Sequence, residues 1–377
     1  MKIAFLTPEF PHPKTGSSGG IGSSIANLAN GLVRLGHEVS VLVYGQAKDG
    51  FFEQDGIAFY QIRNVKFKGL SWWLTRKKIE RLANQLYRDK KVDLVEVPDW
   101  GGISSYIKFD CPVVLRLNGS DAYFCHLDKR PVKWINRHHE KRALQKADAL
   151  LSVSRYTAQL TRELFGLKRD FTVIPNAVDT HRFEPALAVQ NDEILYFGTL
   201  IRKKGLLELP GIFNIVAAKN PNARLTLVGK DSADIATGSP STWKLMRPLF
   251  TPQALERVSY VGAVPYDDVK SRIAAATVCV FPTFAEALPV SWIEAMAMQK
   301  ALVASSVGWA PEVVTDGVDG FLAHPTDHAH FANRIIELLG DASLRGKFGL
   351  SARETVMQKF DTDIVARQNI EFYKGLL

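Results

Sequence analysis

The sequence predicts an α/β fold built from two doubly wound, Rossmann-like domains, each a parallel sheet between layers of helices. Short apolar segments alternate with amphipathic segments along the chain, which is typical of consecutive βα units. The alternation stops at residues 171–183, FTVIPNAVDTHRF, where an X-Pro pair and an Asn turn signal precede a polar stretch. It then starts again, and 377 residues exceed what one hydrophobic core usually supports.

The first half opens with a strand at KIAFLTP, a glycine-rich loop over 9–22 and a helix. Apolar residues recur at helical spacing in that helix: Ile25, Leu28, Leu32 and Leu35. A second strand at HEVSVLVYG completes a βαβ unit, which implies a parallel sheet with a right-handed crossover. Further strands are expected at 92–97, 111–117 and 149–154, with a helix over 134–147.

The second half repeats this pattern. Strands are expected at EILYFGT, RLTLVG, VSYVG, TVCVFP and ALVAS, and helices over 205–218, 266–276 and 289–298. The polar, proline-containing segment 231–253 is expected to be a surface excursion. The chain is helical from 327, and 349–377 is expected to be a long helix, broken near 359–362, whose last part returns to the first domain. The predicted domains are therefore 1–175 with 361–377, and 176–360.

Positive charge is concentrated in one segment. The formal net charge is +8, and residues 63–91 carry ten basic residues against two acids. The rest of the chain is therefore roughly neutral, and such a basic patch favours an anionic partner or surface. No other segment of the sequence resembles a nucleic-acid-binding motif, so no nucleic-acid partner is expected.

Cysteine usage and apolar runs bear on location. Cys111, Cys125 and Cys279 are odd in number, far apart and without metal-ligand spacing, which fits a reducing compartment. The first apolar run, in MKIAFLTPEF, is too short for a signal peptide, and no stretch approaches the length that crosses a bilayer. We expect a cytoplasmic protein, with any membrane contact peripheral and on the inner face of the cytoplasmic membrane.

Two glutamates eight positions apart, Glu286 and Glu294, lie in FAEALPVSWIEAMAMQ. A strand is expected to lead into the loop that holds Glu286, and a helix that starts near Pro289 carries Glu294 on its early turns. The positive end of such a helix stabilises an anionic diphosphate, and glutamates there accept hydrogen bonds from sugar or ribose hydroxyls. The plainer interpretation is a loop acid and an acid that complements the helix dipole.

A basic run, Arg202, Lys203 and Lys204, follows the strand that ends at Gly198. Doubly wound folds bind ligands at the carboxyl ends of their parallel strands, where this loop and the Glu286 loop are both expected. Fixed positive charge there stabilises the charge that develops on a departing nucleoside diphosphate. Alone, three adjacent charges are more often a solvated loop; together, the two loops favour a ligand site.

Four motifs, in this order, resemble those of the large retaining glycosyltransferase family 4. They are VIPNAVDTHRF, the Lys204-Gly205 loop, EALPVSWIEAMA and PEVVTDGVDGFL. The resemblance covers most of the chain and is strongest from about 171 to 325. It implies the GT-B architecture, in which two such domains face each other across a cleft.

The resemblance also implies a role for each matching residue. Lys204 contacts the donor diphosphate, Glu286 the transferred sugar and Glu294 the ribose hydroxyls. Other donor-binding residues are expected at Gly20, Ile21, Gly22, Arg202, Lys203, Gly229, Ala263, Val264, Ala287, Leu288, Pro289 and Val290. Among these, residues 261–264 flank the base, and backbone N–H groups of 287–290 complete the sugar and phosphate contacts. The glycine-rich loop of the first domain approaches the diphosphate closely because it lacks side chains.

The first glycine-rich loop has two other interpretations. A dinucleotide-binding enzyme also begins with a strand, a glycine loop and a helix, but Ile25 stands where the third glycine belongs, and no acid ends the second strand. An ordinary glycine-rich turn fits the loop as well.

Two positions depart from the family pattern. Thr199 stands where the family usually has an arginine, so Arg202 or Lys203 is expected to supply the second positive charge. Asn118, in RLNGSD, stands where the family often has a histidine near the donor sugar. The catalytic candidates in the first domain are therefore Asn118, as a hydrogen-bonding group for the sugar, and Asp121, as an alternative base. A turn or helix cap competes with the second role.

Asp361 and Asp363 have the Asp-x-Asp spacing that another transferase architecture uses to hold a divalent cation. They follow no strand and open a terminal helix, so capping is the favoured interpretation and no metal is predicted. No cofactor is expected besides the nucleoside-diphosphate sugar itself.

Aromatic and basic residues share a predicted helix over 72–88. Trp72 and Trp73 lie at one end, and Ile79, Leu82 and Leu86 lie among five basic residues. Two interpretations fit: the helix rests on an anionic membrane that carries a lipid-linked acceptor, or its apolar face packs on its own domain.

The sequence therefore predicts a retaining, metal-independent hexosyltransferase that moves a sugar from a nucleoside diphosphate to a hydroxyl of a saccharide or lipid-linked acceptor. Assembly of cell-surface polysaccharide or lipopolysaccharide is the expected context. The alternatives are a GT-B epimerase or phosphorylase-like enzyme, and a two-domain sugar-binding protein without chemistry.

Overall fold

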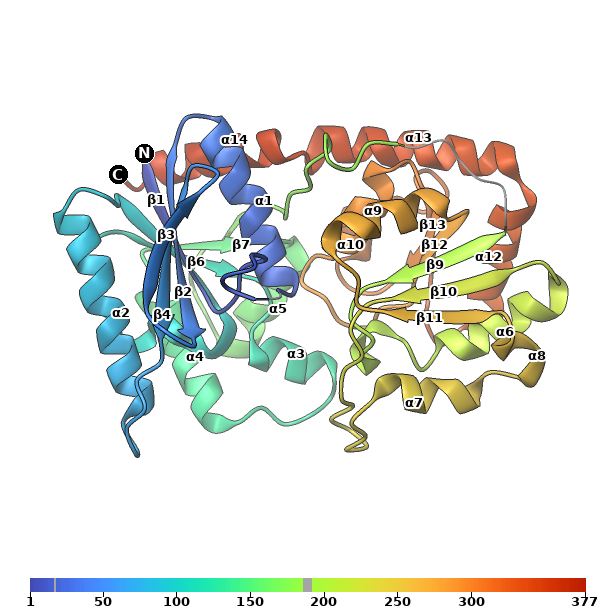
Figure 1. The fold of residues 1–377 in the computed structure, drawn as a ribbon, viewed down its shortest axis with the longest axis horizontal. Coiled ribbons are helices and arrows are strands. Elements are labelled where there is room, and N and C mark those ends of the chain that lie inside the picture. Colours follow the sequence, from blue (N-terminus) through green and yellow to red (C-terminus); the bar gives the residue numbers. More distant parts are fainter. Residues whose placement is uncertain (17, 186–191) are drawn as a thin grey trace. The chain divides into compact units, whose positions relative to one another are not determined.

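The computed structural model describes residues 1–16, 18–185 and 192–377 (Figure 1). Residue 17, in the predicted glycine-rich loop, and part of the polar stretch that follows Phe183 lie outside the described residues. The chain divides into two compact units, residues 1–177 with 360–377 (unit 1) and residues 178–359 (unit 2).

Unit 1 is built on a sheet that has eight strands among the described residues, in the order β3-β4-β2-β1-β5-β6-β7-β8. The strands are β1 (Lys2–Thr7), β2 (Glu38–Gln46), β3 (Gly50–Gln54), β4 (Ile57–Arg63), β5 (Leu94–Pro98), β6 (Val113–Leu117), β7 (Ala149–Ser152) and β8 (Thr172–Val173). Every pairing is parallel except that of β3 with β4. The interior strands β5 and β6 are buried along their whole length because helices cover both faces of the sheet, and their two charged residues, Glu96 and Arg116, pair with each other.

The hairpin of β3 and β4 is absent from the predicted elements, although the sequence carries its signal. Asp55 and Gly56 connect the two strands, and both have positive φ, 52° and 76°. A two-residue Asp-Gly connection of this kind matches the twist of the flanking strands and is a strong hairpin signal.

Helices of unit 1 occupy both faces of its sheet. They are α1 (Gly20–Arg34), α2 (Ser71–Arg88), α3 (Asp121–Leu127), α4 (Trp134–Lys146), α5 (Arg155–Phe165), the 3-10 segment η1 (Trp100–Tyr106) and the C-terminal α14 (Thr362–Lys374). The last helix packs beside α1, as Figure 1 shows, and Val365, Ala366 and Ile370 join the core that α1 covers. The predicted return of the C-terminal helix to the first domain is confirmed.

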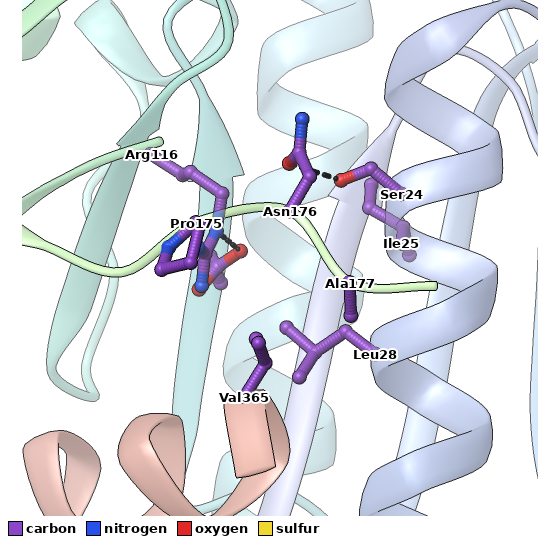
Figure 2. Close-up of a pocket in the computed structure, with 9 residues that line it drawn as sticks. Ser24, Ile25, Leu28, Arg116, Pro175, Asn176, Ala177 and Val365 are labelled. Carbon is purple, nitrogen blue, oxygen red and sulfur yellow. Dashed lines mark hydrogen bonds and ion pairs between the residues drawn. The ribbon is translucent and has the colours of Figure 1, made fainter. Parts of the chain in front are cut away.

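A buried polar network fixes α14 against the sheet of unit 1. Arg116 on β6 donates two hydrogen bonds to Glu96 on β5, at 2.7 and 3.0 Å, and another to the side chain of Asn369. Tyr373 donates its hydroxyl to Glu96 at 2.5 Å. A cavity of about 10 Å³ lies beside this network (Figure 2). That volume is roughly enough for one water molecule, so the cavity is part of the packing.

Unit 2 contains a second parallel sheet, with six strands in the described residues and the order β11-β10-β9-β12-β13-β14. Its strands are β9 (Glu193–Phe197), β10 (Arg224–Val228), β11 (Val258–Gly262), β12 (Val278–Phe281), β13 (Leu302–Ser305) and β14 (Phe321–Ala323). The strand order reverses between β9 and β12. Such a switch point is where open α/β sheets place their ligands.

The helices of unit 2 follow its strands. They are α6 (Leu209–Lys219), α7 (Thr242–Met246), α8 (Pro252–Leu255), α9 (Tyr266–Ala275), α10 (Val290–Ala297), α11 (Ala310–Val313), α12 (His328–Gly340) and α13 (Ala342–Lys359), with 3-10 turns η2 (Arg202–Lys204) and η3 (Arg247–Leu249). The predicted excursion over 231–253 folds as α7, η3 and the start of α8. The predicted break near 359–362 separates α13 from α14.

The prediction that a helix begins at 205 is wrong. Gly205 has φ of 71° and ends η2, and α6 begins only at Leu209. A Cβ at Gly205 would lie 1.6 Å from the carbonyl oxygen of Pro282. The residue therefore permits a close approach of two loops and does not start a helix.

Candidate functional site

The switch point of unit 2 brings together the two loops that the sequence singles out. Lys204 follows β9, and Glu286 follows β12, the strand beside it. Their loops are joined through the backbone, since Phe284 and Ala285 both donate N–H groups to the carbonyl oxygen of Lys203, at 2.8 and 3.1 Å. The basic loop and the glutamate loop therefore form one surface.

Lys204 and Glu286 form an ion pair at this surface, with Nζ 2.9 Å from Oε1 and side chains about 21% and 18% exposed. Burial alone would lower the pKa of Lys204, but the charge of Glu286 outweighs it and the pKa is raised. Burial alone would raise the pKa of Glu286, but the charges of Lys204 and Lys203 hold it below its usual value. Both groups are therefore charged at neutral pH.

Glu294 lies on α10, which begins at Val290 directly after Pro289, as predicted. Its side chain is almost entirely buried, and the hydroxyl of Tyr266 donates to its Oε1 atom. Burial raises the pKa of Glu294 to about 7, against the opposing effects of the Tyr266 hydrogen bond and of the positive charges of Arg182 and Lys204. Lys204 thus interacts electrostatically with both glutamates, and the three predicted residues form one cluster.

Arg202 pairs with Asp234 and not with Glu286. Its guanidinium donates to both oxygens of Asp234, at 2.7 and 2.8 Å, and Asp234 also accepts from the hydroxyl of Thr237 at 2.6 Å. Asp234 is buried, and these hydrogen bonds lower its pKa. In this structure Lys204, rather than Arg202, contacts Glu286.

The other predicted donor residues of unit 2 also follow strand carboxyl ends. Gly229 follows β10, Ala263 and Val264 follow β11, and residues 287–290 lead from β12 into α10. A Cβ at Gly229 would lie 1.9 Å from the carbonyl oxygen of Gly198. The loops after β9 and β10 therefore approach each other so closely that only glycine fits there.

The remaining predicted residues belong to unit 1. Gly20, Ile21 and Gly22 were expected in a loop, but they form the first turn of α1. The carboxylate of Glu9 explains this difference, because it accepts a hydrogen bond from the N–H of Gly22 at 3.1 Å and so satisfies one of the free donors of the helix.

Asn118 and Asp121 lie at the carboxyl end of β6. Asp121 is the first residue of α3, and its carboxylate accepts from Asn136 at 2.9 Å. The helix is capped by Ser120, which accepts from the N–H of Tyr123. The capping role in Asn-Gly-Ser-Asp therefore belongs to Ser120, and Asp121, for which the sequence favours a turn or cap, is not the capping residue.

Asp99 is a residue that sequence reasoning missed. It follows β5, is buried, and accepts from the N–H of Asn118 at 3.0 Å, while its Oδ2 atom is buried without a hydrogen-bond partner. Burial raises the pKa of Asp99 to about 7. An aspartate directly after a buried strand, shortly before Gly101 and Gly102, is the signal that could have identified it.

Asp361 caps α14 by accepting from the N–H of Asp363 at 2.9 Å, so the capping interpretation of this pair is confirmed. Within the described ranges, histidine, cysteine, aspartate and glutamate side chains do not gather in a group of three or more that could hold a metal ion. No helix of the described residues is long and apolar enough to cross a membrane.

Two family models match the chain in succession. The first, glycosyltransferase family 4, matches residues 18–182, and the second, glycosyl transferases group 1, matches residues 191–341. The chain belongs to glycosyltransferase family 4. Among its relatives is the α-maltose-1-phosphate synthase of Mycolicibacterium smegmatis, 26% identical over 99% of both chains. Another is a GDP-mannose-dependent phosphatidylinositol monomannoside mannosyltransferase of Corynebacterium glutamicum, 23% identical over 75% of this chain and 77% of the relative.

Solved structures share the fold of this glycosyltransferase. Sucrose-phosphate synthase from Thermosynechococcus elongatus superposes with a TM-score of 0.80 at 22% identity, over 100% of this chain and 99% of that one. Anabaena HepE in complex with UDP and glucose superposes with a TM-score of 0.77 at 21% identity, over the whole of both chains. The predicted GT-B fold is confirmed.

Proposed function

We propose that this glycosyltransferase moves a hexose-type sugar from a nucleoside diphosphate to a hydroxyl of a saccharide or lipid-linked saccharide, with retention at the anomeric carbon. The Lys204, Glu286 and Glu294 cluster at the switch point of unit 2 carries the proposal. HepE in complex with UDP and glucose, and the GDP-mannose-dependent relative, support a nucleotide-sugar donor.

Each of the three residues is proposed to bind a different part of the donor. Lys204 contacts the diphosphate, Glu286 accepts from hydroxyls of the transferred sugar, and Glu294 accepts from the ribose. The turn into α10 adds backbone N–H groups and the positive end of the helix dipole beside the sugar and phosphates. Gly229 and residues 263–264 border the base. Lys203 adds positive charge beside the phosphates, since Arg202 is paired with Asp234.

Retention is proposed to proceed on one face of the donor sugar. The bond from the anomeric carbon to the β-phosphate oxygen breaks, and the acceptor oxygen bonds to that carbon on the same face. The acceptor's proton passes to the leaving phosphate oxygen, so no protein base is required. Lys204 stabilises the charge that builds on the leaving group, a role in which fixed charges are most effective. The positive charge comes from side chains, and the reaction is proposed to be independent of metal.

Unit 1 is proposed to bind the acceptor. Asn118 and Asp121 lie at the carboxyl edge of its sheet together with Asp99. Gly20, Ile21 and Gly22 in the first turn of α1 are proposed to approach the donor phosphates. Assembly of cell-surface polysaccharide or lipopolysaccharide in the cytoplasm is the proposed context.

Nucleotide release tests the proposal. The wild-type protein, incubated with an acceptor extract and UDP-, GDP- or ADP-sugars, is expected to release the nucleoside diphosphate of one base. Lys204→Ala should lower the rate by about 100- to 1,000-fold, the usual cost of removing a group that stabilises the transition state. Its melting temperature shows whether the variant is folded.

Lys244→Ala is the matched control, because Lys244 is exposed on α7 of the same unit. It should leave the rate unchanged. A folded and fully active Lys204→Ala variant would contradict the site assignment. Release by the wild type of a nucleotide without any acceptor product would favour a hydrolase.

A further inference from the structure

Tyr266 contacts the donor cluster from an element of its own. It is the first residue of α9, directly after the loop that follows β11, whereas Glu294 lies on α10. Its hydroxyl donates to Oε1 of Glu294. Burial and the neighbouring Glu294 charge raise the pKa of Tyr266, so its hydroxyl keeps its proton and remains a donor.

The ring of Tyr266 is fixed on both sides. The guanidinium of Arg182 lies 4.4 Å from the ring centroid and also pairs with Asp267 at 2.6 Å. Phe183 packs edge-on against the ring, with centroids 5.7 Å apart. A cation over an aromatic face and an edge-on ring each favour one orientation of the tyrosine.

The segment that carries Arg182 is itself held in place. Arg353 donates to the carbonyl oxygens of Phe183 and Thr180, at 2.7 and 3.2 Å. The carboxylate of Asp179 accepts from the N–H of Arg182 at 3.1 Å. The segment that supports Tyr266 is therefore held by contacts within the chain itself.

We propose that Tyr266 is a positioning residue for the donor's ribose, acting by holding the carboxylate of Glu294 in the orientation that accepts the ribose hydroxyls. The inference rests on the proposed function, in which Glu294 binds the ribose. A buried carboxylate without a fixed partner would lose both its charge and its orientation. The hydroxyl of Tyr266 supports both.

A role through the ribose differs measurably from ordinary structural support, because it depends on the ligand. If Tyr266 acts through Glu294 on the ribose, its loss should matter only for donors that carry ribose hydroxyls. Removal of the Tyr266 hydroxyl should then raise the KM for the donor. It should leave kcat nearly unchanged, because the ribose lies away from the reacting carbon.

Calorimetric titration with a nucleoside diphosphate and its 2′,3′-dideoxy analogue tests whether the effect of Tyr266 depends on the ribose hydroxyls. The base is the one that the wild-type protein binds. Tyr266→Phe should bind the ribonucleotide about five- to tenfold more weakly than the wild type, which is the scale of one lost hydrogen bond. Both proteins should bind the dideoxy analogue equally. Equal losses for the two ligands would overturn the proposal, because they would indicate a general structural defect.

A double-mutant cycle tests the same route independently. Glu294→Ala and the double variant Tyr266→Phe/Glu294→Ala should bind the ribonucleotide with the same affinity if Tyr266 acts only through Glu294, because alanine removes the acceptor of the Tyr266 hydroxyl. An additive loss would overturn the proposal. A wild-type protein that binds no nucleoside diphosphate would instead contradict the proposed function, and this inference with it. Tyr87→Phe, an exposed tyrosine of unit 1, is the control and should change neither affinity.

Discussion

At the scale of single residues, the two glutamates of the cluster differ in their protonation. Both are close to Lys204, but Glu286 contacts its ammonium group directly and has a lowered pKa. Glu294 is more deeply buried and has a pKa raised to about 7. A pair of carboxyl groups whose environments move their pKa values apart is typical of a functional site. Glu286 keeps its charge across the physiological range, whereas Glu294 titrates within it.

Donor affinity should therefore depend on pH. The ionised form of Glu294 is the better acceptor for hydroxyls, so affinity for an intact nucleotide sugar should rise by up to roughly tenfold from pH 6 to pH 8. Because the pKa of Glu294 is about 7 in the folded protein and 4.5 in its usual state, its contribution to stability is fully present below about pH 4.5 and is lost as the pH rises to about 7. Lys204 and Tyr266 face this carboxyl group, and their raised pKa values mean that both keep their protons over this range. The charge of Arg182 also acts on it.

Titration calorimetry at fixed ionic strength measures the first effect. Glu294→Gln is the control, since it carries no titrating group and should bind with an affinity that is nearly constant with pH. A wild-type profile as flat as that of the glutamine variant would contradict the assignment of Glu294.

The sequence could identify these residues only in part. Lys204, Glu286 and Glu294 follow strands in recognisable motifs, so their positions could be predicted. Tyr266 could not, because its contact with Glu294 joins α9 to α10 and depends on how those helices pack. Asp99 was missed because a single aspartate after a strand is also an ordinary turn residue.

At the scale of elements, the parallel strands and the helices between them follow from apolar periodicity, and all of the predicted strands are present. The start of the helix after β9 is wrongly predicted, because the local sequence favours a start at Gly205 and the helix begins at Leu209. The close approach of Gly205 to Pro282, which decides its conformation, is a tertiary contact. Local patterns therefore predict the elements, while contacts between loops decide their ends.

The buried network that fixes α14 has a measurable energetic role. Tyr373→Phe removes a hydroxyl that donates to a buried carboxylate on β5. A hydrogen bond to a charged group contributes about 1.5–3 kcal/mol, and we expect unit 1 to be destabilised by that amount. Urea unfolding followed by circular dichroism measures the change, with Tyr87→Phe as a control that should be neutral. Equal stability of the two variants would show that the network is dispensable.

At the scale of the whole molecule, the structure confirms one of the two interpretations that the sequence left open for the basic segment. Ile79 and Leu86 are buried in the core of unit 1, so α2 does pack on its own domain. Trp72 and Trp73, at the start of the helix, remain 44% and 39% exposed. Phe67 and Leu70 are exposed beside them, among basic residues. We propose that this end of α2 rests on an anionic membrane surface.

Binding to lipid vesicles tests that surface. The triple variant Arg63→Ala/Lys66→Ala/Lys68→Ala should bind phosphatidylglycerol vesicles roughly 100-fold more weakly than the wild type, at roughly 1 kcal/mol for each of the three charges. Added salt should weaken wild-type binding. The control removes three exposed charges from unit 2, Lys244, Arg247 and Lys347, and should bind like the wild type. Equal binding by both triple variants would indicate attraction to net charge alone.

A crystal structure of the protein with its nucleoside diphosphate tests the central claim most directly. The account predicts that the β-phosphate lies within hydrogen-bonding distance of Nζ of Lys204 and that the ribose hydroxyls contact the carboxylate of Glu294. A nucleotide bound elsewhere, whether in unit 1 or on the basic surface of α2, would contradict it.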